Sequence, residues 1–178
     1  EVNTRQPKIP YQETITRKSE GHHKHKKQTG GRGQFGEVYL RIEPTPRGEG
    51  FKFVDGVVGG RIPNQFIPAI EKGVRDVMEK GVIAGCPVID VQVEVYDGSF
   101  HVVDSDEISF KLAGAQAFKQ AFLAAGPALL EPIVNLEINA PTRCMGDIMG
   151  NLTSRRGRVS GSESIGDMQV IKAQVPLA

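Results

Sequence analysis

The residues best suited to chemistry form one basic, glycine-rich segment between positions 17 and 36. Its cations can bind phosphate, because a guanidinium donates two hydrogen bonds to a phosphate group and an ammonium acts as a compact charge. The net charge of the whole chain is only +1, but the cations cluster in this segment. The clustering predicts a basic end of the molecule that the net charge does not reveal. Three histidines, at positions 22, 23 and 25, lie among the cations, and a single acid, Glu20, opposes them. The cations are Arg17, Lys18, Lys24, Lys26, Lys27 and Arg32.

The glycine cluster at positions 30–36 formally matches the G-x-G-x-x-G pattern of dinucleotide sites. That pattern requires a strand before it and a helix after it, whereas here a charged run precedes and a Val/Leu/Ile strand follows. A loop that binds RNA fits better, because glycine lets backbone amides approach phosphates and bases. Arg32 would bind phosphate, and Gln34 would pair with sugar or base edges. A flexible hairpin loop without a binding role is the alternative.

Other candidate catalytic or metal-binding groups have simpler explanations. Asp104, Asp106 and Glu107 could act as acid–base carboxylates, but helix capping accounts for them, and no nucleophile–base pair is spaced for catalysis. The clustered histidines lack nearby cysteines or a second ligand pair, so no metal site is predicted. No G-x-x-x-x-G-K-[ST] sequence occurs, which excludes nucleotide binding of the P-loop type. We therefore expect no catalytic residue and no cofactor in this chain.

Composition predicts a soluble protein of two small domains in a reducing compartment. The 178 residues are 39% hydrophobic, which is enough for folded cores. Cys86 and Cys144 are far apart in apolar surroundings, so we expect free thiols and no disulfide. No apolar run approaches the ~20 residues that span a bilayer, and residues 1–10 do not resemble a signal peptide. We expect a cytoplasmic protein that does not contact membranes.

The basic segment must be positioned by a first α+β unit, for which we predict the range 1–127. Strands are predicted at 11–18, 38–42, 51–58 and 91–95, with a helix at 67–80. Asp97 and Gly98 should turn the chain into a short return strand at 100–103. Asp104 and Glu107 have capping-box spacing and should start a second helix, which Gly126 ends. The predicted apolar face of that helix consists of Ile108, Leu112, Ala115, Phe118 and Phe122.

The range 128–178 is predicted as a second unit. Strands are expected at 134–139, around 158–161 and at 168–175, with a helix that Pro141 opens and Gly157 caps. The order is β-α-β-β, whereas a complete split β-α-β fold has a second helix and a fourth strand. We therefore expect a ferredoxin-like domain that is incomplete at its C-terminus. The helix should bury Met145, Ile148, Met149 and Leu152 on one face.

Several segments, in order along essentially the whole chain, resemble elongation factor G. The segment 27–36, KQTGGRGQFG, is similar to the first tip loop of domain IV of that family, and 96–105, YDGSFHVVDS, is similar to the second. The segments 51–60, 67–73 and 130–133 also resemble the family, as do Met145-Gly146-Asp147 and Arg155-Arg156-Gly157. The resemblance implies an α+β chain, with a fold like the second domain of ribosomal protein S5 followed by a ferredoxin-like domain V.

The family also implies a function. Its domain IV reaches into the decoding site of the small ribosomal subunit during translocation, and its domain V lies against large-subunit RNA. Partners would be the ribosome, with its rRNA, and the tRNA and mRNA at the decoding site, and neither DNA nor a membrane. The resemblance implies that GTP and Mg²⁺ belong to an N-terminal GTPase domain outside this chain, which itself is no enzyme. The expected RNA-binding residues are Lys24, Lys26, Lys27, Gln28, Gly30, Gly31, Arg32, Gly33, Gln34, Ser99 and His101.

Three alternatives remain open at this level. Glu37 and the pair Arg143-Cys144 differ from the residues usual in the family, so the chain could belong to the main translocase or to a ribosome-recycling or ribosomal-protection paralogue. S5-like domains also occur in small-molecule kinases and other ATPases, which would make the chain a nucleotide-binding enzyme. A scaffold that binds no RNA is the third. The ribosomal function requires the loops around Arg32 and His101 to meet at one end of the folded chain.

Overall fold

A computed structural model describes residues 3–178, which fold into two units that are treated separately below. The larger unit spans Gln12–Leu130, and the smaller one comprises the segment up to Tyr11 together with Glu131–Ala178. Pairing of strand β6 (Pro127–Leu130) with β1 (Gln12–Ile15) holds residues 128–130 in the larger unit. The ranges 1–127 and 128–178 stay a sequence-based prediction.

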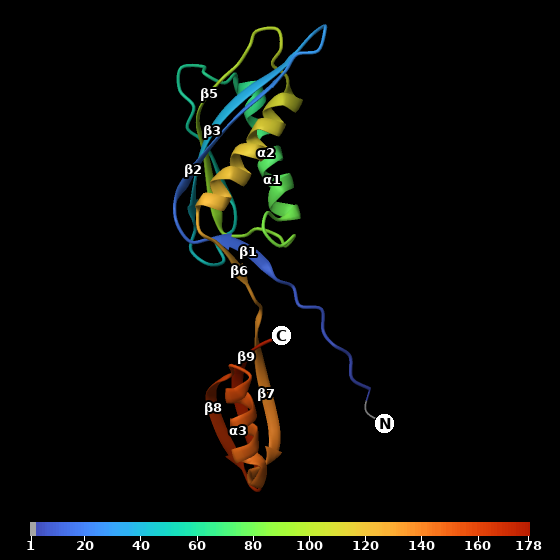
Figure 1. Ribbon diagram of the computed structural model, residues 1–178. Helices are drawn as coiled ribbons and strands as arrows, with labels where there is room; N and C mark the ends of the chain where they lie inside the picture. The colour runs from blue at the N-terminus through green and yellow to red at the C-terminus, as the bar shows by residue number, and fades with distance from the viewer. Residues whose placement is uncertain (1–2) are drawn as a thin grey trace. The chain divides into compact units, whose positions relative to one another are not determined.

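The larger unit is a four-stranded sheet with two helices on one face (Figure 1). The strand order is β2-β3-β5-β4, in which only the β4–β5 pair is parallel. A short 3-10 turn, η1 (Asn64–Phe66), leads into the first helix. The elements are β2 (Ser19–Lys27), β3 (Gln34–Pro44), β4 (Lys52–Asp55), α1 (Ile67–Lys80), β5 (Val91–Ser99) and α2 (Glu107–Ala124).

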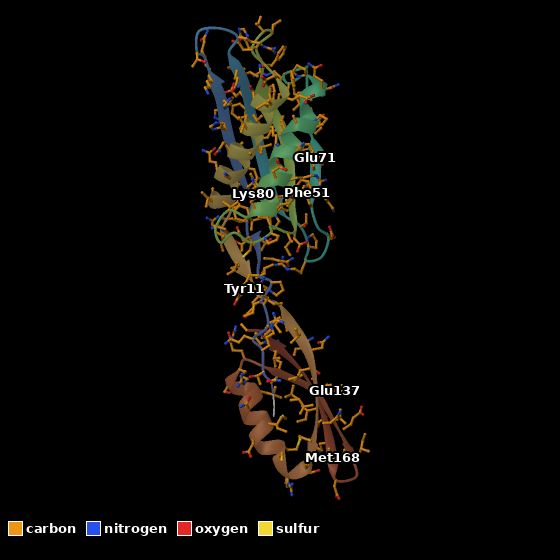
Figure 2. The ribbon with its side chains drawn as sticks, turned by 90° about the vertical axis from the view of Figure 1, so that its right-hand side faces the viewer. Tyr11, Phe51, Glu71, Lys80, Glu137 and Met168 are labelled. Carbon is orange, nitrogen blue, oxygen red and sulfur yellow. The ribbon has the colours of Figure 1, made fainter. Side chains whose placement is uncertain are left out.

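The core of this unit lies between the sheet and the two helices. Alternate residues of β3 and β5, such as Leu40 and Val93, are buried, because successive strand residues point to opposite faces. Helix α1 packs closely on α2, since a Cβ at Gly73 would lie 2.2 Å from the Lys111 carbonyl oxygen. Figure 2 labels Glu71 and Lys80 on α1, of which Lys80 is exposed. The helix predicted at 67–80 is confirmed at both ends.

The predicted buried face of α2 is wrong in part. Ile108 and Leu112 are 61% and 41% exposed, whereas Phe110 is fully buried. The helix carries apolar residues around most of its circumference, so periodicity alone did not single out the inward face. Its N-cap is Asp106, whose Oδ1 accepts a hydrogen bond from the Ser109 amide at 2.7 Å. The predicted capping role of Asp104 is therefore also wrong.

Several strand predictions differ from the structure as well, among them the strand predicted at 51–58, which is limited to β4. The basic run belongs to a strand, β2, because its backbone pairs with β3 from Ser19↔Ile42 to Lys27↔Gln34. Positions 16–18 are not part of β1, which ends at Ile15. The expected return strand at 100–103 is absent from the described chain, since β5 continues to Ser99 and the following residues form turns.

Two buried carboxylates fasten loops of the larger unit. Glu13 accepts hydrogen bonds from the amides of Val82, Ile83, Ala84 and Cys86 at 2.8–3.1 Å. Burial by itself raises the pKa of Glu13, but these four hydrogen bonds outweigh it, and the net pKa lies below the usual value.

Asp90 acts similarly on the β3–β4 connection. Its carboxylate accepts hydrogen bonds from Arg47 and from the amides of Gly48 and Gly50, at 2.9–3.2 Å. Burial opposes ionisation, but these contacts outweigh it, so the pKa of Asp90 lies below its usual value. Asp90 also has a φ of 57°, in the left-handed region that few non-glycine residues adopt.

The smaller unit is a three-stranded antiparallel sheet in the order β7-β9-β8, with helix α3 packed on it. Strand β7 (Ile133–Pro141) carries Glu137, and β9 (Met168–Pro176) begins with Met168; Figure 2 labels both residues. The core is built around Leu152, Ile171 and Ala173. The remaining elements are η2 (Thr142–Cys144), α3 (Met145–Ser154) and β8 (Arg158–Ile165).

The helix end in this unit follows the sequence prediction only in part, because α3 ends at Ser154 and the left-handed residue after it is Arg156 rather than Gly157. The Gly157 amide donates to the Leu152 carbonyl oxygen at 2.7 Å, after Arg156 adopts a φ of 61°. The order β-α-β-β is as predicted and is that of the first part of a ferredoxin-like fold. Among residues 3–178, no helix is long and apolar enough to cross a membrane.

Candidate nucleic-acid interface

Two loops that are distant in sequence meet at one end of the larger unit. The glycine loop (residues 28–33) joins β2 to β3, and the histidine loop (residues 100–105) joins β5 to α2; together we call them the tip (Figure 1). Arg32 Nε donates to the Val103 carbonyl oxygen at 3.1 Å. The Gly33 amide donates to Asp104 Oδ1 at 3.0 Å. The loops around Arg32 and His101 therefore meet at one end, as the expected ribosomal function requires.

The glycines of the first loop have different structural reasons. Gly30 has a φ of 55°, which L side chains rarely adopt, and Gly33 has no room for a Cβ, which would lie 2.9 Å from the Lys27 carbonyl oxygen. Gly31 has neither constraint, because no atom of the described residues lies within 4 Å of an added Cβ and its φ is outside the left-handed region. The fold therefore requires glycine at two of these positions, but not at Gly31.

The histidine loop is organised around the ring of His101. Its Nδ1 lies 3.2 Å from the Val103 amide nitrogen and 3.1 Å from the Asp104 amide nitrogen, both of which donate to it. The His101 amide donates to Ser105 Oγ at 2.8 Å, and Ser105 Oγ donates to the Phe35 carbonyl oxygen at 2.9 Å. The side chain of His101 is 54% exposed. The ring is thus held through Nδ1, and about half of the side chain stays accessible to solvent.

The predicted lysines lie on β2 and are exposed, but they do not share one face. Lys24 and Lys26 point to the face of the hairpin away from the helices, and Lys27 points to the opposite face, because strand residues alternate. Lys24 Nζ lies 5.8 Å from the centroid of the Phe35 ring and 3.9 Å from Glu37 Oε1. Gln28 is exposed beyond the last paired residue.

Two predicted contact residues already have protein partners. Gln34 Oε1 lies 2.9 Å from His25 Nε2, and Ser99 Oγ donates to the Glu37 carboxylate. His22 Nε2 also lies 2.8 Å from Glu37 Oε1. Burial raises the pKa of Glu37, but the hydrogen bonds from Ser99 and His22 and the charge of Lys24 outweigh it, so the net pKa is lowered. Binding of RNA by Gln34 and Ser99 stays a prediction.

Sequence reasoning missed several residues of the tip. The spacing predicts a helix cap at Asp104, whereas this residue contacts Gly33 of the glycine loop and His101 of the histidine loop. Val102 and Val103, expected in a strand, are 90% and 60% exposed, and Phe100 is 41% exposed. A β-branched run directly after Asp97-Gly98 is typical of a strand, so no local signal distinguished it. No cluster of potential metal ligands is found among the described residues.

Comparison with known families gives the decisive observation. Residues 7–126 match the model of elongation factor G domain IV, and residues 128–178 match the model of the elongation factor G C-terminus. The chain belongs to the elongation factor G family. Both parts of the chain therefore correspond to defined regions of a translation elongation factor, in the order that the sequence indicated.

Individual relatives agree with the elongation factor G assignment. The chain is 52% identical over 178 residues to elongation factor G of Aquifex pyrophilus and 54% identical over 179 residues to an elongation factor G-like protein of Thermotoga maritima. Each alignment covers 100% of this chain and 26% of the relative. The chain thus spans about a quarter of the length of these relatives.

A solved structure supports the fold class. A crystal structure of a protein from Thermus thermophilus superposes with a TM-score of 0.84 and 45% sequence identity. The match covers 97% of this chain and 26% of that one. The α+β class, with an S5 domain 2-like fold followed by a ferredoxin-like part, is therefore confirmed for this elongation factor G region.

Proposed function

We propose that this chain is the ribosome-binding region of an elongation factor G-type GTPase, and that its tip enters the decoding site to contact tRNA and mRNA during translocation. The observation that carries the proposal is the joining of the Arg32 and His101 loops into one exposed end. Such an end combines bare backbone, a guanidinium and an imidazole, which suit RNA phosphates and base edges.

The anchoring of Arg32 supports phosphate binding. Its Nε is used by the Val103 carbonyl oxygen, and among the described residues no partner is found for the two terminal nitrogens. The held Nε reduces the freedom of the side chain, so less entropy is lost when the free nitrogens bind a phosphate. Lys24, Lys26 and Lys27 add charge close by.

Salt dependence of RNA binding tests this proposal. If Lys24, Lys26, Lys27 and Arg32 all met phosphates of a single strand, the logarithm of the binding constant would fall with the logarithm of salt concentration at a slope of about −2.8. The measurement would use the 178-residue chain and a fluorescent RNA that carries the decoding-site sequence. A matched control is Lys119→Ala, which removes an exposed lysine from α2 and should leave the slope unchanged.

The translocation step itself can be tested in an elongation factor G whose corresponding region is replaced by this chain. His101→Ala should slow translocation and leave GTP hydrolysis nearly unchanged, because we propose that GTP and Mg²⁺ bind in a domain outside this chain. Equal loss of both activities would contradict a role for the tip. Subunit splitting in place of translocation by the unsubstituted chimera would favour a ribosome-recycling paralogue.

The remaining alternatives predict other outcomes. An S5-like enzyme would bind nucleotide, which calorimetry on the isolated chain would detect. A scaffold would show neither RNA binding nor salt dependence. We favour the non-catalytic, RNA-binding function because the exposed Arg32 guanidinium and Gly31 amide are hydrogen-bond donors rather than a nucleophile with its base.

A further inference from the structure

We propose that Asp104 is the positioning residue of the tip, and that the tip which it organises presents His101 Nε2–H as a hydrogen-bond donor to acceptor oxygens of RNA. This inference rests on the proposed function, since it names the chemistry that the same site would recognise. Asp104 would act through its neighbours and need not touch RNA itself.

Asp104 joins the two loops through three different groups. Its Oδ1 accepts from the Gly33 amide at 3.0 Å, and its carbonyl oxygen accepts from the Phe35 amide at 3.0 Å. Its own amide donates to His101 Nδ1 at 3.1 Å. One residue thus connects the glycine loop, the start of β3 and the imidazole ring.

The packing around Gly33 fits this role. Gly33 is buried, and a Cβ there would lie 3.0 Å from Asp104 Oδ2. The absence of a side chain therefore lets the carboxylate reach the Gly33 amide. The side chain of Asp104 is only 23% exposed, so water competes weakly for this hydrogen bond.

The contacts of His101 determine which ring nitrogen carries the proton. Nδ1 accepts from two amides, those of Val103 and Asp104, so it must be the unprotonated nitrogen of a neutral ring. Nδ1 also lies 3.6 Å from Asp104 Oδ2, but this distance is too long for a hydrogen bond, and the two shorter amide contacts decide the tautomer. The proton then resides on Nε2, for which no partner is found among the described residues.

Three exposed groups of the tip have the same polarity, although Gln28 and Thr29 of the glycine loop can also accept hydrogen bonds. The Nε2–H of His101, the terminal nitrogens of Arg32 and the amide of Gly31 can only donate. A ligand that fits all three must supply acceptors, such as phosphate oxygens, ribose oxygens or base carbonyls. Exocyclic amino groups of bases would meet another donor and are disfavoured at these positions.

The test compares Asp104→Ala with Asp104→Asn in the 178-residue chain. Asparagine keeps a carbonyl oxygen that can accept from the Gly33 amide, so it should retain most of the function. Alanine should weaken binding of decoding-site RNA about five- to tenfold, the effect of one net hydrogen bond. Asp55→Ala is a matched control, because Asp55 Oδ1 accepts from the Val57 amide in a loop of the same unit.

Nuclear magnetic resonance provides a readout that does not depend on RNA. Imidazole nitrogen shifts of the unsubstituted chain should identify the Nε2–H tautomer of His101. Hydrogen exchange at the Gly33 amide, whose acceptor is the Asp104 side chain, should quicken in Asp104→Ala but not in Asp104→Asn. An Nδ1–H tautomer would overturn the assignment of His101 as a donor through Nε2. RNA binding that is unchanged in Asp104→Ala, or that asparagine fails to restore, would overturn the role of Asp104. Failure of the unsubstituted chain to bind RNA would instead overturn the proposed function.

Discussion

Arg32 Nε donates a hydrogen bond to the carbonyl oxygen of Val103, 71 positions along the sequence. Because of this contact, the positive charge of Arg32 and the planar shape of its guanidinium can be tested separately. Lysine at position 32 would keep the charge but could not donate from an equivalent planar nitrogen. We expect Arg32→Lys to weaken RNA binding while the salt slope stays nearly constant. Arg32→Ala should weaken binding further and make the slope about 0.7 less steep, as for one lost phosphate contact. Identical slopes for the unsubstituted chain and Arg32→Ala would contradict a phosphate contact.

Alanine substitutions of Gly33 and Gly31 should have different effects, the first on stability and the second on RNA binding. Gly33→Ala should lower the melting temperature, because its Cβ would collide with the Lys27 carbonyl oxygen and the Asp104 carboxylate. Gly31→Ala should leave the melting temperature unchanged, since its surroundings are open, but should weaken RNA binding if the bare backbone contacts the ligand. Unchanged binding by Gly31→Ala would indicate that this glycine has no contact role.

The stability of the larger unit should depend on pH through Glu13 and Asp90. The pKa values of both carboxyl groups are lowered in the folded state, so their stabilisation is complete above the ordinary values of 4.5 and 3.8. It is lost as the pH falls through the lowered folded-state pKa values. Denaturant unfolding between about pH 7 and pH 3 would measure this loss.

Glu13→Gln should remove most of the contribution of Glu13 to this pH dependence. It should also cost about 3 kcal/mol at neutral pH, because an amide can offer only one oxygen to the four amides that Glu13 binds. Glu163→Gln is the control, since Glu163 is exposed on β8. A pH profile of Glu13→Gln parallel to that of the unsubstituted chain would show that Glu13 does not contribute.

Substitutions along α2 should distinguish its true inner face from the predicted one. Phe118→Ala should cost about 3–5 kcal/mol of unfolding free energy, because the ring is fully buried. Ile108→Ala should cost less than about 1 kcal/mol, since this side chain is 61% exposed. Chemical denaturation of both variants would measure the difference, and equal losses would contradict the packing described for α2.

The elements that the sequence predicted well carry their own start and stop signals. Helix α1 has Pro68 in its first turn and Gly81 after its last residue, and both ends follow these residues. Strand β5 alternates valines with polar residues, so its buried face was evident. The meeting of the tip loops was inferred only from resemblance to a family, because no periodicity in the sequence relates Arg32 to His101.

The elements that were missed depend on contacts remote in sequence. Strand β2 is polar on both faces and is extended because its backbone pairs with β3. The valines of the histidine loop have strand propensity, but the amides of Val103 and Asp104 are held by the ring of His101. Asp104 has the spacing of a helix cap, and only the folded chain brings it to Gly33.

The alternation of Lys26 and Lys27 on β2 constrains how a polyanion can follow the hairpin. Neighbouring strand residues project in opposite directions, so the two ammonium groups stand on opposite sides of the ribbon that β2 and β3 form. The β3 edge of this ribbon is bonded to the histidine loop at Phe35. An RNA chain that engages both lysines must curl around the rim of the ribbon. The alternative is that the hairpin binds two separate RNA segments, one on each of its faces. The hairpin would then lie between two RNA strands.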